Sequence, residues 1–266
     1  MSNLLTKIDD NGIATLSLNK PEKHNCFDDT LILEITKALN TLASNKAVRV
    51  LILAGEGKSF SAGGDLSWMQ RMANYTHEEN EKDASQLAEM LRVLNEFPKP
   101  TIARVQGAAF GGAVGLVSCC DMAIGAERAS FSLSEVKIGL IPATISPYVI
   151  QAIGVRASRR YFQTGERFNA EAALKLGLLS EVVSEEELDS TINDLVDVLL
   201  ANSPQALTQA KQLILDYANR EITPDLIKDS CTRIADIRVS AEGQEGLKAF
   251  LEKRSPNWVK QGPNHV

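Results

Sequence analysis

Apolar positions in the first part of the chain follow two spacings, one typical of buried strands and one typical of an amphipathic helix. Ile13–Leu18 alternates small and large residues after a glycine turn, and Val48–Leu53 is almost continuously apolar, so both are predicted strands. Between them a helix is predicted from Asp28 or Asp29 onward, because apolar residues recur at helical spacing: Leu31, Ile32, Ile35, Leu39 and Leu42. This order predicts a right-handed crossover between two parallel strands.

The same pattern partly recurs and then becomes mainly helical. Pro100–Val105 is a predicted strand, Gly112–Cys120 suits a helix, and Asp121–Gly125 is the next short strand. From Ser158 onward the pattern is mostly helical, and each of two helices begins with a cap residue and a first-turn proline, at Ser203-Pro204 and Thr223-Pro224. We therefore expect an α/β core over residues 1–200 and a helical C-terminal region over residues 201–266.

Composition indicates a folded globular protein and excludes several classes of partner. The 266 residues are 44% hydrophobic and 23% charged, which argues against a disordered chain. A net charge of −6 favours neither nucleic acid nor an anionic membrane surface. The apolar runs are too short to span a bilayer and the N-terminus has no apolar signal core, so we expect a cytoplasmic protein with no membrane partner.

The metal-binding residue types are scattered along the chain. None of the cysteines forms a CxxC pair, and in a reducing compartment they are interpreted as small buried hydrophobes: Cys26, Cys119, Cys120 and Cys231. The histidines also lack ligand spacing: His24, His77 and His265. No metal site is expected.

Two glycine-rich loops each follow a predicted strand. They are Ser59–Asp65 and Gly107–Gly115. Such loops can be simple tight turns, or they can let backbone N–H groups approach a ligand oxygen at a helix N-terminus. Neither GxGxxG after the first strand nor the P-loop pattern occurs, which argues against a nucleotide-binding fold of those types.

Five segments, in order and over nearly the whole chain, resemble the crotonase (enoyl-CoA hydratase/isomerase) superfamily. They are Asn19–Asn25, Ala62–Asp65, Gly107–Gly112, Ser134–Pro142 and Glu242–Arg254. The resemblance implies a crotonase-like spiral of ββα units with a helical C-terminal trimerisation region. It also implies a homotrimer or homohexamer that binds an acyl-CoA substrate, with no cofactor besides the CoA of that substrate.

The resemblance further implies an oxyanion hole and one catalytic carboxylate. The backbone N–H groups of Ala62 and Gly112 would bind the thioester oxygen and stabilise an enolate more than the ground state. Glu135 would be the acid and base, with its pKa raised by an apolar surrounding, although its local sequence alone favours a surface glutamate on a short helix. Other residues expected at the substrate are Lys20, Lys23, Gly63, Gly64, Asp65, Leu66, Arg71, Gly111 and Pro142.

Several of these residues have competing interpretations. Asp65 is better explained as the cap of a helix beginning near Leu66 than as a catalytic acid, and Asp121 as a turn or core carboxylate. Trp68, Met69 and Met72 either line the acyl pocket or belong to the core. The lysines Lys20 and Lys23 are candidates for the CoA phosphates, as are Lys253 and Arg254, and each can instead be an ordinary surface charge.

One position departs from the superfamily pattern. Typical hydratases carry a second glutamate where this chain has Gly115, which is expected to leave room for a water but no side chain to orient it. Yet Gly111–Asp121 and Ile141–Val149 resemble bacterial methylglutaconyl-CoA hydratases of leucine catabolism. That resemblance implies hydration of a branched, carboxylated enoyl-CoA, with Arg71 as the candidate that binds the carboxylate. A Δ3,Δ2-enoyl-CoA isomerase and a catalytically silent acyl-CoA binder are the alternatives.

Overall fold

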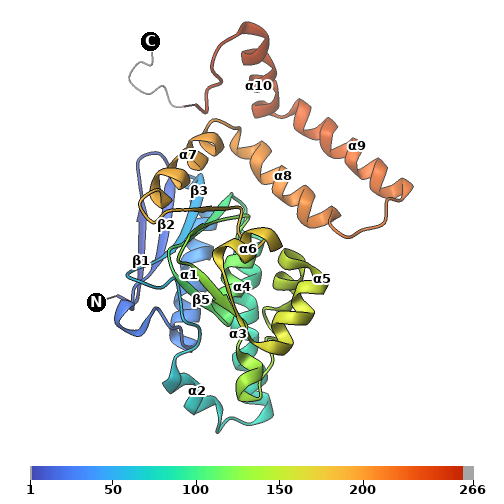
Figure 1. Ribbon diagram of the computed structural model, residues 1–266. Coiled ribbons are helices and arrows are strands. Elements are labelled where there is room, and N and C mark those ends of the chain that lie inside the picture. The colour runs from blue at the N-terminus through green and yellow to red at the C-terminus, as the bar shows by residue number, and fades with distance from the viewer. Residues whose placement is uncertain (1, 260–266) are drawn as a thin grey trace.

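A central sheet of mostly parallel strands organises the N-terminal part of the molecule (Figure 1). The computed structural model describes residues 2–259, and within them this sheet has the order β1-β2-β3-β4-β6-β9. β1 is antiparallel to β2, and the remaining neighbours are parallel. The strands are β1 (Leu4–Ile8), β2 (Ile13–Leu18), β3 (Val50–Gly55), β4 (Thr101–Val105), β6 (Met122–Ala126) and β9 (Glu181–Val183). The α/β class and the parallel pairing of β2 with β3 are thus confirmed.

A second, smaller sheet joins three short strands beside the first. β5 (Ala108–Phe110) pairs with β7 (Ser130–Ser132), which in turn pairs with β8 (Arg167–Asn169). None of these strands was predicted from the sequence, because three residues are too few to show an alternating pattern.

Helices cover both faces of the central sheet. On one face a large apolar core lies between the sheet and four helices, and on the other face a smaller core lies under α7 (Leu188–Leu200). The four helices of the large core are α1 (Asp29–Ser44), α3 (His77–Asn95), α4 (Gly112–Cys119) and α5 (Ser146–Thr164). Two one-turn helices, η1 (Pro21–Lys23) and η2 (Glu135–Ile138), and two short helices, α2 (Leu66–Met72) and α6 (Ala170–Leu176), complete this part.

Local sequence signals explain where the helices begin. Asp28 caps α1 by accepting a hydrogen bond from the Leu31 amide at 2.9 Å, and the apolar residues predicted for this helix are all buried. Helix α3 begins with a capping box formed by Thr76 and Glu79. Helix α5 is interrupted at Gly154, whose φ of 76° divides it into two helical pieces.

The C-terminal helices extend away from the rest of the molecule in Figure 1. They are α8 (Pro204–Tyr217), α9 (Pro224–Val239) and α10 (Ala241–Glu252), of which the first two begin at the predicted cap-and-proline pairs. Neither α8 nor α9 buries a single residue in the isolated chain. Their beginning agrees with the expected boundary near residue 200, while the division into two units remains a prediction.

Two further expectations concern membranes and metals. Within the described residues, no helix has the length and hydropathy needed to cross a membrane. The same part of the chain contains no group of three or more His, Cys, Asp or Glu side chains placed to hold a metal ion. His265 lies outside the described residues.

Candidate active site

The two glycine-rich loops are hydrogen-bonded side by side. The Ser61 amide donates to the Ala108 carbonyl, and the Phe110 amide donates to the Ser61 carbonyl, each at 3.0 Å. On its other side the first loop is held by Phe27, whose amide donates to Gly63 O and whose carbonyl accepts from the Asp65 amide, each at 2.9 Å. Backbone bonds on both sides therefore fix where the amide groups of this loop point.

These bonds correct one expected oxyanion donor. The Ala62 amide donates to the His24 carbonyl at 2.9 Å, so it is already engaged. The Gly63 amide donates to Ser61 Oγ at 3.2 Å. Among the described residues, no acceptor is recorded for the amide of Gly64, which makes Gly64 the donor that this loop offers. The sequence alone could not show this, because the assignment depends on the distant His24 carbonyl.

The second loop presents the amide of Gly112. Gly112 is the first residue of α4, where an N–H group has no acceptor inside its own helix. A Cβ atom at Gly112 would lie only 2.6 Å from Cζ of Phe27, so the ring of Phe27 requires glycine here. The neighbouring Gly111 has a positive φ of 56°, which also favours glycine.

Glu135 faces these loops from the start of η2. Its side chain is half-buried, and a Cβ atom at Gly111 would lie 3.2 Å from its Oε1. Its Oε2 is buried with no hydrogen-bond partner in the described part of the chain. Burial raises the pKa of this carboxyl above the ordinary glutamate value, because the charged form loses hydration. This environment contradicts the alternative of a solvated surface glutamate.

Glu135, Gly112 and Pro142 line a common pocket of about 600 Å³. Its walls are mostly apolar and include Trp68, Met72, Leu87, Leu140, Ile141 and Ile145. Its polar contributions, apart from Glu135, come from Asn80, Asp83 and Thr144. Trp68 combines both proposed roles, since it is buried in the core and also lines the pocket, whereas Met69 does not line it.

Residues of α3 in this pocket were missed by the sequence reasoning. Asp83 accepts a hydrogen bond from Trp68 Nε1 at 3.0 Å, and burial raises its pKa. The capping box at Thr76 and Glu79 is the sequence signal that would have revealed α3. It marks the beginning of the helix, although it does not show which face of the helix meets the pocket.

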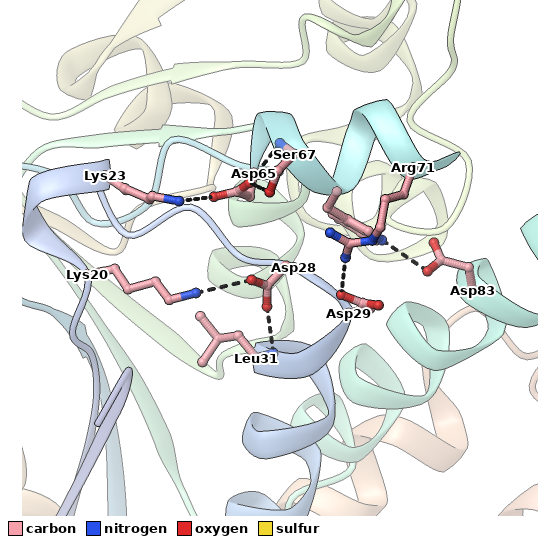
Figure 2. A network of polar contacts seen from close by, with 10 residues as sticks. Lys20, Lys23, Asp28, Asp29, Leu31, Asp65, Ser67, Arg71 and Asp83 are labelled. Carbon is pink, nitrogen blue, oxygen red and sulfur yellow. Dashed lines mark hydrogen bonds and ion pairs between the residues drawn. The ribbon is translucent and has the colours of Figure 1, made fainter. Parts of the chain in front are cut away.

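Asp65 has the structural role expected of it. It caps α2 by accepting from the Ser67 amide at 2.8 Å, and it also binds the Ser67 hydroxyl and Lys23 Nζ. The hydroxyl of Ser67, followed by the Lys23 ammonium, holds the pKa of Asp65 well below its usual range. Figure 2 shows this cluster beside the ion pair of Lys20 with Asp28, at 3.1 Å. Both expected phosphate-binding lysines therefore lie next to the first glycine loop, each paired with a carboxylate.

The structure does not bring Arg71 into the pocket. Its guanidinium pairs with Asp29 at 2.6 Å, as Figure 2 shows, while Asp83 accepts its hydrogen bond from Trp68. Arg71 is not among the residues that line the pocket. In the single chain its guanidinium is therefore not placed to bind a substrate carboxylate there. Leu66 is likewise largely exposed and outside the pocket lining.

Two further candidates for CoA binding lie at the end of α10. Arg254 forms ion pairs with Glu245 and Glu252, and Lys253 is exposed. In Figure 1, α10 and the pocket helix α2 lie at opposite ends of the molecule. Within one chain, these cations are therefore not part of the pocket.

From the sequence, free space is expected beside Gly115, but the place that a side chain would take there is occupied. A Cβ atom at Gly115 would lie 2.4 Å from Cγ2 and 2.8 Å from Cβ of Ile145, and 3.3 Å from Cδ2 of Leu91. The volume beside Gly115 is therefore filled by hydrocarbon. The pocket has no carboxylate at this position, and any side chain at residue 115 would overlap Ile145.

Comparisons with known proteins agree with this geometry. The sequence model described as enoyl-CoA hydratase/isomerase matches residues 9–261. The crystal structure of an enoyl-CoA hydratase from Shewanella pealeana is similar with a TM-score of 0.94 and 47% identity, covering 97% of this chain and 96% of that one. The crotonase-like fold expected from the sequence is thus confirmed.

Curated relatives with several activities are also similar. A hydroxycinnamoyl-CoA hydratase-lyase from Pseudomonas fluorescens is 34% identical, over 92% of this chain and 91% of its own length. A trans-2-decenoyl-[acyl-carrier-protein] isomerase from Streptococcus mutans is 29% identical, over 94% of this chain and 95% of its own. Since the family match spans most of the chain, this protein belongs to the enoyl-CoA hydratase/isomerase family.

Proposed function

We propose that this protein adds water to a branched, carboxylated enoyl-CoA of the methylglutaconyl type, with Glu135 as its acid–base group. The observation that carries the acid–base role is the buried, unpartnered Oε2 of Glu135, which lies in the same pocket as the Gly112 amide. An unpaired carboxylate in an apolar pocket is destabilised as an anion and is therefore suited to exchange protons near neutral pH. This state argues against a catalytically silent acyl-CoA binder.

The proposed oxyanion hole is formed by the amides of Gly64 and Gly112. Water attacks the β-carbon of the enoyl thioester while Glu135 accepts its proton, and the electron pair of the C=C bond moves onto the thioester oxygen. The two amides stabilise that negative charge. Protonated Glu135 then donates its proton to the α-carbon as the enolate collapses, so one molecule of water is added and the carboxylate is regenerated.

The acyl group is assigned from the two segments that resemble methylglutaconyl-CoA hydratases. One of them, Ile141–Val149, contributes several walls of the pocket, including Ile141, Pro142 and Ile145. For the carboxylate, we propose that Arg71 exchanges Asp29 for the substrate. Lys20 and Lys23 are proposed to bind CoA phosphates, with Lys253 and Arg254 as further candidates from a neighbouring copy. The proposed assembly is a cytoplasmic homotrimer or homohexamer.

A mass-resolved substrate panel tests the reaction. 3-Methylglutaconyl-CoA is expected to gain one water rapidly and crotonyl-CoA slowly, because crotonyl-CoA lacks both the branch and the carboxylate. Calorimetry should show that CoA thioesters bind and that the matching free acids bind poorly. Absence of a hydrated product from every enoyl-CoA would contradict the proposed reaction.

One observation favours a Δ3,Δ2-enoyl-CoA isomerase as the second candidate. Ile145 fills the place beside Gly115, so that position supplies neither a second carboxylate nor a water. A single carboxylate is enough to move a proton from C2 to C4 of a 3-enoyl-CoA. In deuterated water, turnover of a 3-enoyl-CoA to a 2-enoyl product without added water, faster than any hydration, would establish this reaction instead.

A further inference from the structure

One aromatic residue contacts both loops of the proposed oxyanion hole, although it does not line the pocket. Phe27 lies directly before Asp28, the cap residue of α1, and its side chain is 1% exposed. It is not among the residues around the pocket that contains Glu135. Any effect of Phe27 on the reaction must therefore act through the residues that it contacts.

The backbone of Phe27 sets the direction of the donor in the first loop. Its amide donates to the Gly63 carbonyl, and its carbonyl accepts from the Asp65 amide, each at 2.9 Å. The Gly63 carbonyl belongs to the same planar peptide group as the Gly64 N–H, which in a trans peptide points the opposite way. The hydrogen bond from Phe27 therefore turns the Gly64 N–H away from Phe27.

The ring of Phe27 reaches the donor of the second loop. Its Cζ and Cε2 lie 2.6 and 3.2 Å from the place where a Cβ atom of residue 112 would stand. The tip of the ring thus fills the side-chain position of Gly112, at the first turn of α4. Because the interior of a protein is closely packed, the length of the ring fixes how near Gly112 can approach the backbone of Phe27.

Trp68 supports this arrangement from the first loop. Its Cε3 and Cζ3 lie 3.5 Å from the Cβ position of Gly64, and its ring centroid is 6.4 Å from that of Phe27. Asp83 holds the indole by accepting from Nε1 at 3.0 Å. Both rings are buried, so Phe27 cannot tilt towards Trp68 without displacing it.

We infer that Phe27 is a positioning residue that sets the spacing of the two oxyanion donors, the amides of Gly64 and Gly112. This inference rests on the proposed function, because it concerns the same oxyanion hole. The backbone of Phe27 directs one donor and its ring supports the other, so a shorter side chain alters the distance between them. Donors stabilise an oxyanion when they lie at about 2.7–3.1 Å from it, so a small change in spacing weakens their effect.

The spacing is tested without turnover by the infrared carbonyl stretch of bound butyryl-CoA, isotope-labelled at the thioester carbonyl. Two well-placed donors polarise the C=O bond and lower its frequency relative to the free thioester. Phe27→Leu keeps the backbone bonds but removes the ring tip, so it should make this lowering smaller. Phe97→Leu is the matched control, because Phe97 is also 1% exposed and lies outside the pocket lining, and it should leave the frequency unchanged.

A compensating substitution separates positioning from a general loss of packing. Gly112 has no positive φ, so Gly112→Ala is compatible with the backbone and adds a methyl group where the ring tip lies. Alone it should also make the lowering smaller. Combined with Phe27→Leu, the methyl group fills part of the vacated volume, so the frequency should return towards the wild-type value. Should Phe27→Leu fail to fold, the same cycle is run with Phe27→Met, whose flexible chain retains more of the buried volume.

The inference is overturned by a wild-type frequency in Phe27→Leu, by an equal change in Phe97→Leu, or by effects of Phe27→Leu and Gly112→Ala that simply add. With the preferred enoyl-CoA, Phe27→Leu should lower kcat about tenfold or more with KM little changed, since complete loss of one oxyanion donor costs about 10²–10³-fold. A wild-type protein that hydrates no enoyl-CoA would instead contradict the proposed function, while the carbonyl frequencies would still decide whether Phe27 sets the spacing.

Discussion

Two opposite environments act on the carboxylates of this site at the scale of single residues. Glu135 is half-buried without a partner for Oε2, which raises its pKa, whereas Asp65 binds Ser67 and Lys23, which lowers its pKa. At neutral pH, Asp65 is therefore fixed as an anion, and Glu135 is the group able to exchange a proton. These environments assign different roles to two acids that are both close to the glycine loops.

Replacement of Glu135 by glutamine should reduce turnover roughly 10²–10⁴-fold, the usual contribution of an acid–base group. The amide keeps the shape of the side chain, so folding should be retained. Steady-state kinetics with the preferred enoyl-CoA measures the loss. Glu127→Gln is the matched control, because Glu127 is exposed and lies outside the pocket. Wild-type activity in Glu135→Gln would remove this residue from the mechanism.

The raised pKa of Glu135 also predicts how stability depends on pH. A carboxyl whose folded pKa is raised stabilises the protein below its unfolded pKa, about 4.3, and this stabilisation is lost as pH rises through the folded pKa. Glutamine does not ionise, so the melting temperature of Glu135→Gln relative to wild type should increase as pH rises from 4 to 8. Thermal unfolding at several pH values measures this difference. A difference that is independent of pH would mean that the pKa is not raised.

The role proposed for Arg71 is tested by replacing, in turn, each partner of the ion pair that it forms with Asp29. Arg71→Ala should weaken the binding of a carboxylated enoyl-CoA about tenfold or more relative to the binding of one without a carboxylate. The reason is that a charge-assisted hydrogen bond contributes about 1.5–3 kcal/mol. Asp29→Asn removes the competing carboxylate and should increase the same preference. Equal effects of Arg71→Ala on both substrates would show that Arg71 does not bind the substrate carboxylate.

The residues of the site differ in how well the sequence predicts them. Glu135 and Gly112 were proposed from the motifs that resemble the superfamily, and the structure places both in one pocket. The engaged Ala62 amide and the filled space beside Gly115 were not foreseen, because they depend on His24 and Ile145, which are distant in sequence. A motif identifies the residue types that chemistry needs, but it does not show which atoms tertiary contacts leave free.

At the scale of elements, cap residues and periodicity explain the successful predictions. Helices α1 and α8 begin where Asp28 and the Ser203-Pro204 pair indicate, and β3 is buried along its whole length. The strands β5, β7, β8 and β9 have three residues each, and pairing with a neighbouring strand rather than local sequence defines them. Short elements of this kind cannot be recognised before the tertiary structure is known.

Two substitutions of Asp65, at the N-terminus of α2, distinguish a helix-capping role from a catalytic one. Asp65→Asn keeps an oxygen that can cap the helix, so stability and turnover should remain close to wild type. Asp65→Ala removes the cap and should lower the free energy of unfolding by about 1 kcal/mol. It should also reduce activity, because the Gly64 amide is no longer held in place. Chemical denaturation and kinetics on both variants measure these effects. An Asp65→Asn variant that folds but has the activity of Glu135→Gln would make Asp65 a catalytic acid.

At the scale of the whole molecule, the C-terminal helices present apolar side chains that the isolated chain leaves uncovered. Phe250 and Leu251 are 80% and 78% exposed, and Ile214 on α8 is 66% exposed. Large exposed apolar patches usually mark an interface between proteins. These exposed side chains on α8 and α10 are the observation behind the proposed assembly through the C-terminal helices.

Light scattering at micromolar concentration should therefore give the mass of three or six chains. Phe250→Asp places a charge on the uncovered surface and should shift the mass towards the monomer. Leu33→Asp, at an exposed apolar position on α1, is the matched control and should not change the mass. A monomeric wild-type protein would rule out this mode of assembly.

The uncovered helices also have a consequence for the life of the protein after synthesis. Helices α8 and α9 bury no residue in the single chain, so little of their folding free energy can come from their own core. If the chains assemble through these helices as proposed, the stability of the helices increases with protein concentration, because mass action couples it to the encounter of other copies. In the proposed assembly, a chain that has not met its partners would leave these helices open to local unfolding, so unassembled copies should be cleaved by proteases before assembled ones.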